Sequence, residues 1–287
     1  MGRRCGLWLL LGYLLAPSAA PAAAAQAGDV ARIMREGERL VYDVTWAGIK
    51  AGQATLESLG IVQFRGRPAY HLTTTAQSSA FISKFYRVDD HNASYLDVSP
   101  LRSLRFEKHL REGRYRHSSF TDFDHEGKTV FYRYLDFTPV PKDISKLEEA
   151  EKHSTYTKKE FPLVPGSLDE LSVLYYVRGL PLVEGRTIYA SVFASSKNWE
   201  LEVRVLRREV LDTTLGQRET LVVEPLLKFE GIFQQKGRML VWLTNDPERI
   251  PVQMKSEIVI GSFVSTLIRR DVGIAQASAS GQGAQNP

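Results

Sequence analysis

Cysteine is nearly absent from the 287-residue sequence, whose single thiol is Cys5. This residue lies before an apolar stretch, residues 7–15, whereas a cysteine that carries a lipid anchor follows such a stretch. If the first 25 residues are cleaved off, the remaining chain contains no cysteine. Disulfides, thiolate metal sites and cysteine nucleophiles are then excluded. The lack of a stray thiol also suits an oxidising compartment.

Long hydrophobic runs are missing beyond the N-terminal region. No later segment approaches the roughly 18 continuous apolar residues that a membrane-spanning helix needs, so we expect no transmembrane span in the mature chain. A strong excess of charge is missing too, because removal of residues 1–25 with Arg3 and Arg4 lowers the formal net charge from +4 to +2. Near-neutrality argues against a nucleic-acid partner.

Recognisable catalytic and cofactor motifs are absent as well. The sequence has no G-x-S-x-G, S-x-x-K, P-loop or G-x-G-x-x-G run. None of the six histidines lies in an H-E-x-x-H pattern, and only two, His117 and His125, are spaced compactly; the others are His71, His91, His109 and His153. We therefore predict no catalytic residue, no metal site and no cofactor, and leave enzymatic activity open.

Adjacent acidic residues such as Asp89 and Asp90 leave a glycan hydrolase as the weakest interpretation. A glycosidase needs two carboxylates about 5 to 9 Å apart. Neighbours on a regular strand point to opposite faces of the sheet, so these two cannot face one pocket. The sequence therefore offers no recognisable catalytic spacing.

The N-terminus has the three parts of a secretory signal. Arg3 and Arg4 form a basic region, residues 7–15 form an apolar core, and Ala23-Ala24-Ala25 supplies the small residues of a cleavage site. We expect cleavage after Ala25 and a periplasmic protein, with association with the outer membrane as an open alternative. An uncleaved anchor is the weaker alternative, because the apolar core is too short to span about 30 Å of hydrocarbon.

Short alternating runs typical of β-strands fill most of the remaining chain. Leu40, Tyr42, Val44 and Trp46, for example, fall on one face at a period of two. We expect a short helical turn at 79–84, and strands near 40–46, 53–59, 69–75, 85–96, 101–110, 115–123, 129–135, 186–195, 199–206, 216–227, 237–244, 251–260 and 261–268. About a dozen strands without βαβ alternation predict a mainly β fold, an antiparallel β-barrel or half-barrel of curved sheets.

One helix interrupts the strands at about residues 167–178. Ser167 and Glu170 fit a capping box at its start, and Gly179 with Pro181 ends it. An apolar stripe runs along it, formed by Leu168, Leu171, Leu174 and Tyr175. A helix in the middle of such a chain can plug the open face of a curved sheet.

Residues 138–165 lose the alternation and hold a lysine- and glutamate-rich stretch bracketed by prolines. Two interpretations stay open: a solvated loop with a helical turn near 143–152, or a strand at 155–159 between two loops. We treat 37–270 as a single β-rich domain, with two β halves hinged around the helix as the alternative. Residues 271–287 are small and polar, and we expect them to form a disordered tail.

The candidate ligand pocket is predicted from aromatic residues and glycines. Trp46 is followed by Gly48 and Gly52, which permit unusual dihedrals or close backbone approach, and Trp242 precedes an Asp-Pro turn. Tyr175 and Arg178 lie at the end of the expected helix. Packing of the tryptophans in the core, and a dipole interaction for Arg178, are the alternative explanations.

Three segments, residues 37–52, 168–178 and 236–252, together resemble a widespread family of exported bacterial proteins called DUF3108, a domain of unknown function. Gly261 followed by an apolar strand matches the usual end of that family. The resemblance implies an envelope-associated, β-barrel-like fold and supplies no catalytic residue. The chain's last strands are also similar to those of half-barrel lipoprotein carriers, at the level of fold alone.

We accordingly expect a non-enzymatic envelope protein that binds an apolar or amphiphilic ligand, a lipid or a glycoconjugate, in a β-barrel-like pocket. The alternative is a protein-interaction module in envelope or polysaccharide assembly, whose 139–165 loop contacts an envelope protein partner.

Overall fold

The computed structural model describes residues 30, 32–136, 156–229, 232–233, 238–257 and 261–273. The expected signal segment at 1–25, the part of the 138–165 excursion that precedes residue 156, and the tail from residue 274 onward lie outside the described residues.

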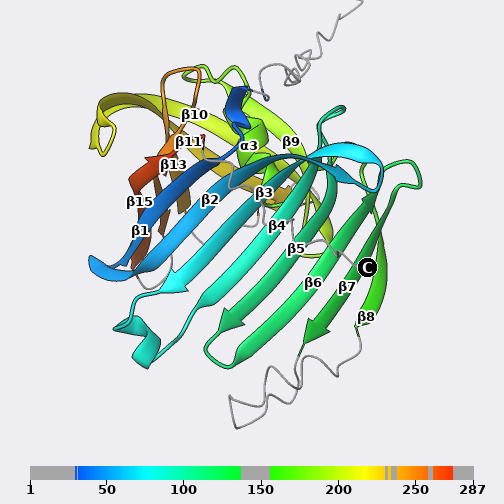
Figure 1. Ribbon diagram of the computed structural model, residues 1–287. Coiled ribbons are helices and arrows are strands. Elements are labelled where there is room, and N and C mark those ends of the chain that lie inside the picture. Colours follow the sequence, from blue (N-terminus) through cyan, green and yellow to red (C-terminus); the bar gives the residue numbers. More distant parts are fainter. Residues whose placement is uncertain are drawn as a thin grey trace, which may run out of the picture.

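The first half of the chain forms an uninterrupted antiparallel meander (Figure 1). Each strand pairs with the next one in sequence. Tight turns join β1 to β2, β2 to β3 and β5 to β6, whereas residues 79–88 join β3 to β4. The strands are β1 (Glu38–Trp46), β2 (Ile49–Phe64), β3 (Arg67–Ser78), β4 (Asp89–Asp97), β5 (Ser103–Glu112), β6 (Tyr115–Asp124), β7 (Thr129–Asp136) and β8 (Thr157–Pro162).

The second half continues the same sheet from the other side of β1. Its strands are β9 (Thr187–Ala194), β10 (Lys197–Thr213), β11 (Gly216–Phe229), β12 (Ile232–Phe233), β13 (Arg238–Thr244), β14 (Pro251–Glu257) and β15 (Ser262–Asp271). β15 pairs with β1, so the path through the sheet runs from β8 through β1 and β15 to β9, with β12 beside β11. The expected mainly β, antiparallel half-barrel is confirmed.

The sheet curves strongly, and its edge strands β8 and β9 are not hydrogen-bonded to each other. Residues 163–168 bridge these edges at one end instead. Leu168 forms a parallel bridge with Val192 of β9, and Leu163 N–H donates to the carbonyl of Lys128 beside β7. Asn198 of β10 completes the bridge by donating to the carbonyl of Pro162 at 2.8 Å.

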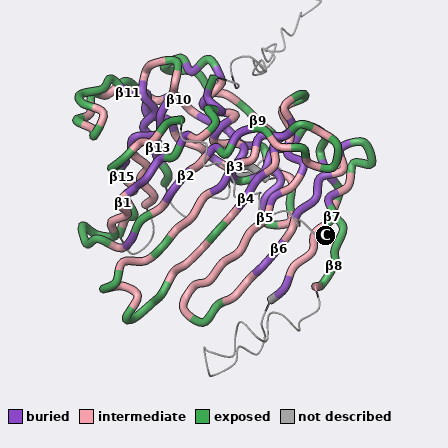
Figure 2. Tube along the Cα trace, viewed as in Figure 1, coloured by how far each residue is buried: buried purple, intermediate pink, exposed green. Residues whose placement is uncertain are grey.

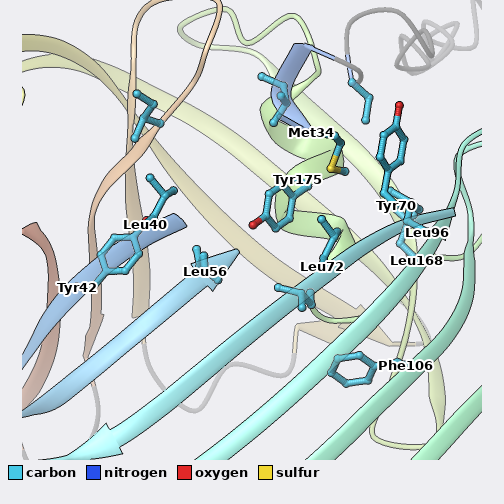
Figure 3. Close-up of a cluster of buried hydrophobic side chains, with 14 of the residues drawn as sticks. Met34, Leu40, Tyr42, Leu56, Tyr70, Leu72, Leu96, Phe106, Leu168 and Tyr175 are labelled. Atoms are coloured by element: carbon cyan, nitrogen blue, oxygen red, sulfur yellow. The ribbon is translucent and has the colours of Figure 1, made fainter. Parts of the chain in front are cut away.

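The helix α3 (Ser172–Arg178) lies inside the curve, between the two halves of the sheet (Figure 1). Tyr175 packs in a buried cluster with Leu40, Tyr42 and Leu56 of β1 and β2 (Figure 3). Buried segments gather around α3, whereas the turns at the lower edge of the view are exposed (Figure 2). The helix therefore plugs the curved sheet, as the sequence predicts.

The expected start of the helix and its capping box were wrong. The helix begins at Ser172 because the backbone of Leu168 is already hydrogen-bonded to β9. Asp169 Oδ1 accepts the backbone N–H groups of Leu171 and Ser172, each at 2.8 Å. Ser167 Oγ instead donates to the carbonyl of Val164, and Glu170 pairs with a lysine of β5.

Other element boundaries differ by a few residues. The helical turn expected at 79–84 is the 3-10 helix η1 (Ile82–Lys84), and the strand expected from residue 85 begins at Asp89. The described part of the strand expected at 251–260 is β14 (Pro251–Glu257), and residues 258–260 lie outside the described residues. Of the two interpretations of 138–165, the described part favours a strand, because β8 occupies Thr157–Pro162.

Candidate functional site

An apolar cavity of about 390 Å³ lies between α3 and the second half of the sheet. Val173, Leu174 and Val177 form its helix wall. The opposite wall consists of side chains from β9, β10, β11, β13 and β14: Val192, Ala194, Leu201, Val203, Val223, Pro225, Leu227, Met239, Val241, Leu243 and Met254. Among the described residues, Glu170 is the one charged residue in the lining.

The cavity forms because α3 fills only part of the curved sheet. Tyr175 points toward β1 and β2 and fills the space on that side (Figure 3). The residues that face β10 and β13 are the smaller Val173 and Val177. Side chains smaller than leucine, four valines with Ala194 and Pro225, make up six of the eleven residues on the facing strands, so the two walls do not interdigitate fully.

A cation and an anion meet at the wall of the cavity. Lys108 Nζ on β5 lies 2.7 Å from Glu170 Oε2, and both side chains are partly exposed. Lys108 also lies over the ring of Phe106, 5.4 Å from its centroid. The site therefore combines an apolar chamber with one polar, charged position, which is the arrangement that suits an amphiphilic molecule.

Met239 marks an exposed position in the lining, with 39% of its surface accessible. A cross-strand row leads from it along the same face of the sheet. Met239 pairs with Ser256, Ser256 with Phe263, and Phe263 with Trp46. Directly paired residues project from the same face, so Phe263 and Trp46 continue the inner surface on which Met239 lies.

A buried polar cluster fixes the start of α3 against β4 and β5. Asp169 Oδ2 accepts from the hydroxyls of Ser94 and Ser103, each at 2.6 Å. Burial raises the pKa of Asp169, and the hydrogen bonds from Ser103 and Ser94 oppose that rise. Because every member is buried and hydrogen-bonded within the protein, the cluster anchors the helix instead of presenting a reactive group.

His125 belongs to the same anchor. Its Nδ1 accepts the N–H of Gly166, which leaves Nε2 to donate to the carbonyl of Ser103 at 2.7 Å. Burial lowers the pKa of His125 and favours this neutral tautomer. The ring therefore binds the backbone of Ser103 and not its hydroxyl, so the pair lacks the geometry of an activated serine nucleophile.

The predicted site residues Tyr175 and Arg178 are close together but belong to the core. The Arg178 guanidinium lies 5.2 Å from the Tyr175 ring centroid, and both residues are at most 2% exposed. Arg178 donates to Glu38 and to the carbonyls of Glu248 and Arg249. Burial raises the pKa of the Tyr175 hydroxyl far above its ordinary range.

The structure separates Trp46, Gly48 and Gly52 from that pair. Trp46 and Gly48 lie at the opposite end of β1 from Glu38, and Trp46 stacks on Phe263 with ring centroids 6.3 Å apart. Gly52 allows β2 and β3 to approach closely, because a Cβ there would lie 2.1 Å from the carbonyl oxygen of Gln77. Trp242 is buried in the same hydrophobic cluster as Tyr175, whereas its neighbours Val241 and Leu243 belong to the cluster that lines the cavity.

Sequence reasoning missed the valine-rich walls and the Lys108–Glu170 pair. A signal for the walls exists in β13, whose residues Leu240, Val241, Trp242 and Leu243 are consecutive and apolar. Such a run indicates a strand that is covered on both faces. Nothing in the sequence pairs Lys108 with Glu170, since they are 62 residues apart.

Within the described ranges, no three His, Cys, Asp or Glu side chains gather closely enough to hold a metal ion. In that same part of the chain, no helix has the length and apolar character needed to cross a bilayer.

Comparisons with known proteins agree with this architecture. The model of a family described as a protein of unknown function, DUF3108, matches residues 41–268. A β-barrel-like protein of the domain of unknown function DUF1849 from Brucella abortus is 11% identical, with a TM-score of 0.54 over 83% of this chain and 99% of that one. This likeness shows a shared β-barrel-like fold.

A candidate exported protein with a YmcC-like fold from Bacteroides fragilis is 9% identical, with a TM-score of 0.36 over 83% of this chain and 96% of its own. No curated protein matches the sequence.

Proposed function

The chain belongs to the DUF3108 family, and on that premise we propose that it is a non-enzymatic binding protein for an amphiphilic ligand, a lipid or a glycoconjugate. The apolar part of the ligand occupies the cavity beside α3. The observation that carries this proposal is the cavity itself, whose volume of about 390 Å³ is lined by apolar side chains with Glu170 as the exception. Ligand pockets of proteins have volumes of roughly 300 to 1,000 Å³.

The polar part of the ligand lies at the Lys108–Glu170 pair. An acyl chain in the cavity gains about 0.8 kcal/mol for each buried methylene. A headgroup at the cavity wall lies beside a cation and an anion that are only 2.7 Å apart. A charged headgroup can therefore form an ion pair with the member of opposite charge. This arrangement favours a molecule with one long apolar arm and one charged or hydrogen-bonding end.

In this proposal the protein acts in the periplasm, within the cell envelope. The N-terminal basic residues, apolar core and Ala23-Ala24-Ala25 support export. A carrier of an amphiphile in that compartment needs an internal chamber, because the exposed acyl chain of a free lipid is unfavourable in water.

Titration with a dansylated fatty acid tests the proposal. We expect saturable binding that tightens about fourfold for each added methylene, corresponding to about 0.8 kcal/mol, until the cavity is full. Val241→Phe places extra atoms in the cavity and should weaken binding at least tenfold.

Ile61→Phe on β2 is the matched control, because Ile61 is 56% exposed and is not part of the cavity lining. It should bind the probe as the unaltered protein does. If the unaltered protein binds no probe, or if chain length has no effect on affinity, the proposed function is wrong. If Val241→Phe binds normally while keeping its fold, the ligand lies outside this cavity.

A further inference from the structure

Three neighbouring turns form an exposed aromatic rim at one edge of the sheet, at the lower edge of Figure 1. We define the rim as residues 46–50 between β1 and β2, 79–88 between β3 and β4, and 111–116 between β5 and β6. Hydrogen bonds join the three segments: Ser79 Oγ donates to the carbonyl of Lys50, and Gly113 N–H donates to the carbonyl of Arg87. The rim is therefore one continuous surface.

The rim exposes several large apolar side chains. Phe85 is 79% exposed and Phe81 is 58% exposed, and their rings touch edge to face. The others are Trp46, Ile49, Tyr86 and Tyr115, each 37% exposed or more. A contiguous exposed patch of this kind marks an interaction surface.

The same three segments are basic. They contain six basic residues, Lys50, Lys84, Arg87, Arg111, Arg114 and Arg116, and a single acidic residue, Glu112. Flanking acids offset part of this charge, since Asp43 binds Lys50, Asp89 binds Arg87 and Asp90 accepts the backbone N–H of Arg111. Six basic residues against these three acids and Glu112 leave an excess of positive charge. Aromatic rings interleaved with Lys and Arg match the interface of an anionic bilayer, where rings enter the headgroup layer and cations meet phosphates.

The rim also leads into the cavity. The cross-strand row Met239, Ser256, Phe263 and Trp46 continues to Ile49, which pairs with Trp46. Apart from Ser256, each of these side chains is apolar and at least 37% exposed. They form an apolar path on the inner face from the rim to the wall of the cavity.

We propose that the rim docks on the surface of an anionic phospholipid bilayer, and that the row from Ile49 to Met239 guides an acyl chain between that bilayer and the cavity. The docking proposal depends only on the rim, whereas the transfer of an acyl chain rests on the proposed function of the cavity. Docking inserts Phe81 and Phe85 at the headgroup level and places Lys84 and Arg87 beside lipid phosphates. The mouth of the cavity then faces the lipid from which its ligand comes.

Sedimentation with vesicles tests the docking. The purified protein should sediment with vesicles that contain phosphatidylglycerol and remain largely in solution with vesicles of phosphatidylcholine alone. The double variant F81S/F85S should lower the partition constant on phosphatidylglycerol vesicles roughly tenfold or more, because two exposed rings no longer enter the bilayer. Both side chains are exposed, so the variant should keep the thermal midpoint of the unaltered protein.

V164S/V183S is the matched control, because these valines are 46% and 51% exposed and lie outside the rim. It should sediment as the unaltered protein does. Docking is refuted if the protein binds neither kind of vesicle, if it binds both kinds equally well, or if F81S/F85S binds as well as the control.

A second measurement does not depend on sedimentation. Brominated phospholipids should quench the fluorescence of Trp46, and the quenching should disappear in Trp46→Phe. Quenching that persists in Trp46→Phe would contradict the proposed orientation. Val241→Phe separates the two proposals, since it should lose the fatty-acid probe and still bind vesicles. Vesicle binding without any probe binding would contradict the cavity function and leave docking supported.

Discussion

Arg178 at the end of α3 and Glu38 at the start of β1 form an ion pair of 3.1 Å, with both side chains only 1% exposed. Glu38 also accepts two hydrogen bonds from Arg270, which in turn binds Glu248. Glu38, Arg178 and Glu248 come from the three segments that carry the resemblance to DUF3108. Those segments therefore meet in one ionic network that fixes α3 to the sheet.

The buried pair predicts a large loss of stability when one partner is removed. Arg178→Met leaves Glu38 paired with Arg270 alone among the described cations, and it should lower the free energy of unfolding by about 3 to 5 kcal/mol. The double variant with Glu38→Gln should lose less than the sum of the two single variants. Urea unfolding of all four proteins measures this coupling. Additive losses would contradict the role of the pair.

Asp169 predicts a defined pH dependence. Burial raises its pKa above the ordinary 3.8, so the folded chain binds this proton more tightly than the unfolded chain. The contribution of the carboxyl to stability is therefore fully present below about pH 4, and it is lost as the pH rises through the folded pKa. Asp169→Asn keeps an oxygen for the N–H groups of Leu171 and Ser172 but cannot titrate.

The stability of the unaltered protein relative to Asp169→Asn should consequently fall as the pH rises above 4. Urea unfolding of both proteins across this range gives the difference directly. A difference that grows with pH would mean that the hydrogen bonds from Ser94 and Ser103 outweigh burial, contrary to this account.

The Lys108–Glu170 pair should set the charge preference of the ligand. Lys108→Gln leaves the carboxylate of Glu170 unopposed at the cavity wall, so an anionic dansylated fatty acid should bind roughly fivefold more weakly. Glu170→Gln leaves the cation and should strengthen binding by a similar factor. An uncharged naphthylamine probe serves as the control and should bind all three proteins alike. Equal changes for both probes would indicate altered packing instead.

Gly52 and Gly48 should respond differently to alanine. A Cβ at Gly52 would meet backbone atoms of β3, with Gln77 O at 2.1 Å, and no rotamer change can relieve that contact. We expect Gly52→Ala to cost stability at the upper end of about 1 to 3 kcal/mol. Gly48 has φ +83° and open space around it, so Gly48→Ala adds backbone strain alone, about 1 kcal/mol. Thermal unfolding that ranks Gly48→Ala as the costlier change would contradict this reading.

Local alternation was enough to predict most of the fold. Leu40, Tyr42 and the following strands show period two because one face of the meander packs on the core. The start of α3 was not predictable in the same way. A capping box at Ser167 and Glu170 is locally sound, but the bridge from Leu168 to β9 and the burial of Asp169 are tertiary interactions that override it.

Only part of the candidate site could be predicted from the sequence. A pocket under the helix follows from a curved sheet with a central helix, and Trp46 and Gly48 lie on the rim. The sequence does not show which face of the sheet Trp242 lies on, because β13 is apolar on both faces and its periodicity is ambiguous. The cavity depends on how completely Val173 and Val177 fill the space facing β10, which is a property of packing.

A crystal structure with a bound fatty acid that carries bromine at its methyl end would locate the ligand directly. The anomalous signal of bromine should lie between α3 and β10–β13, within contact of Val203, Val223 and Val241. The carboxylate should lie near Lys108. Bromine at any other place on the protein, under conditions in which the probe is shown to bind, would contradict the account.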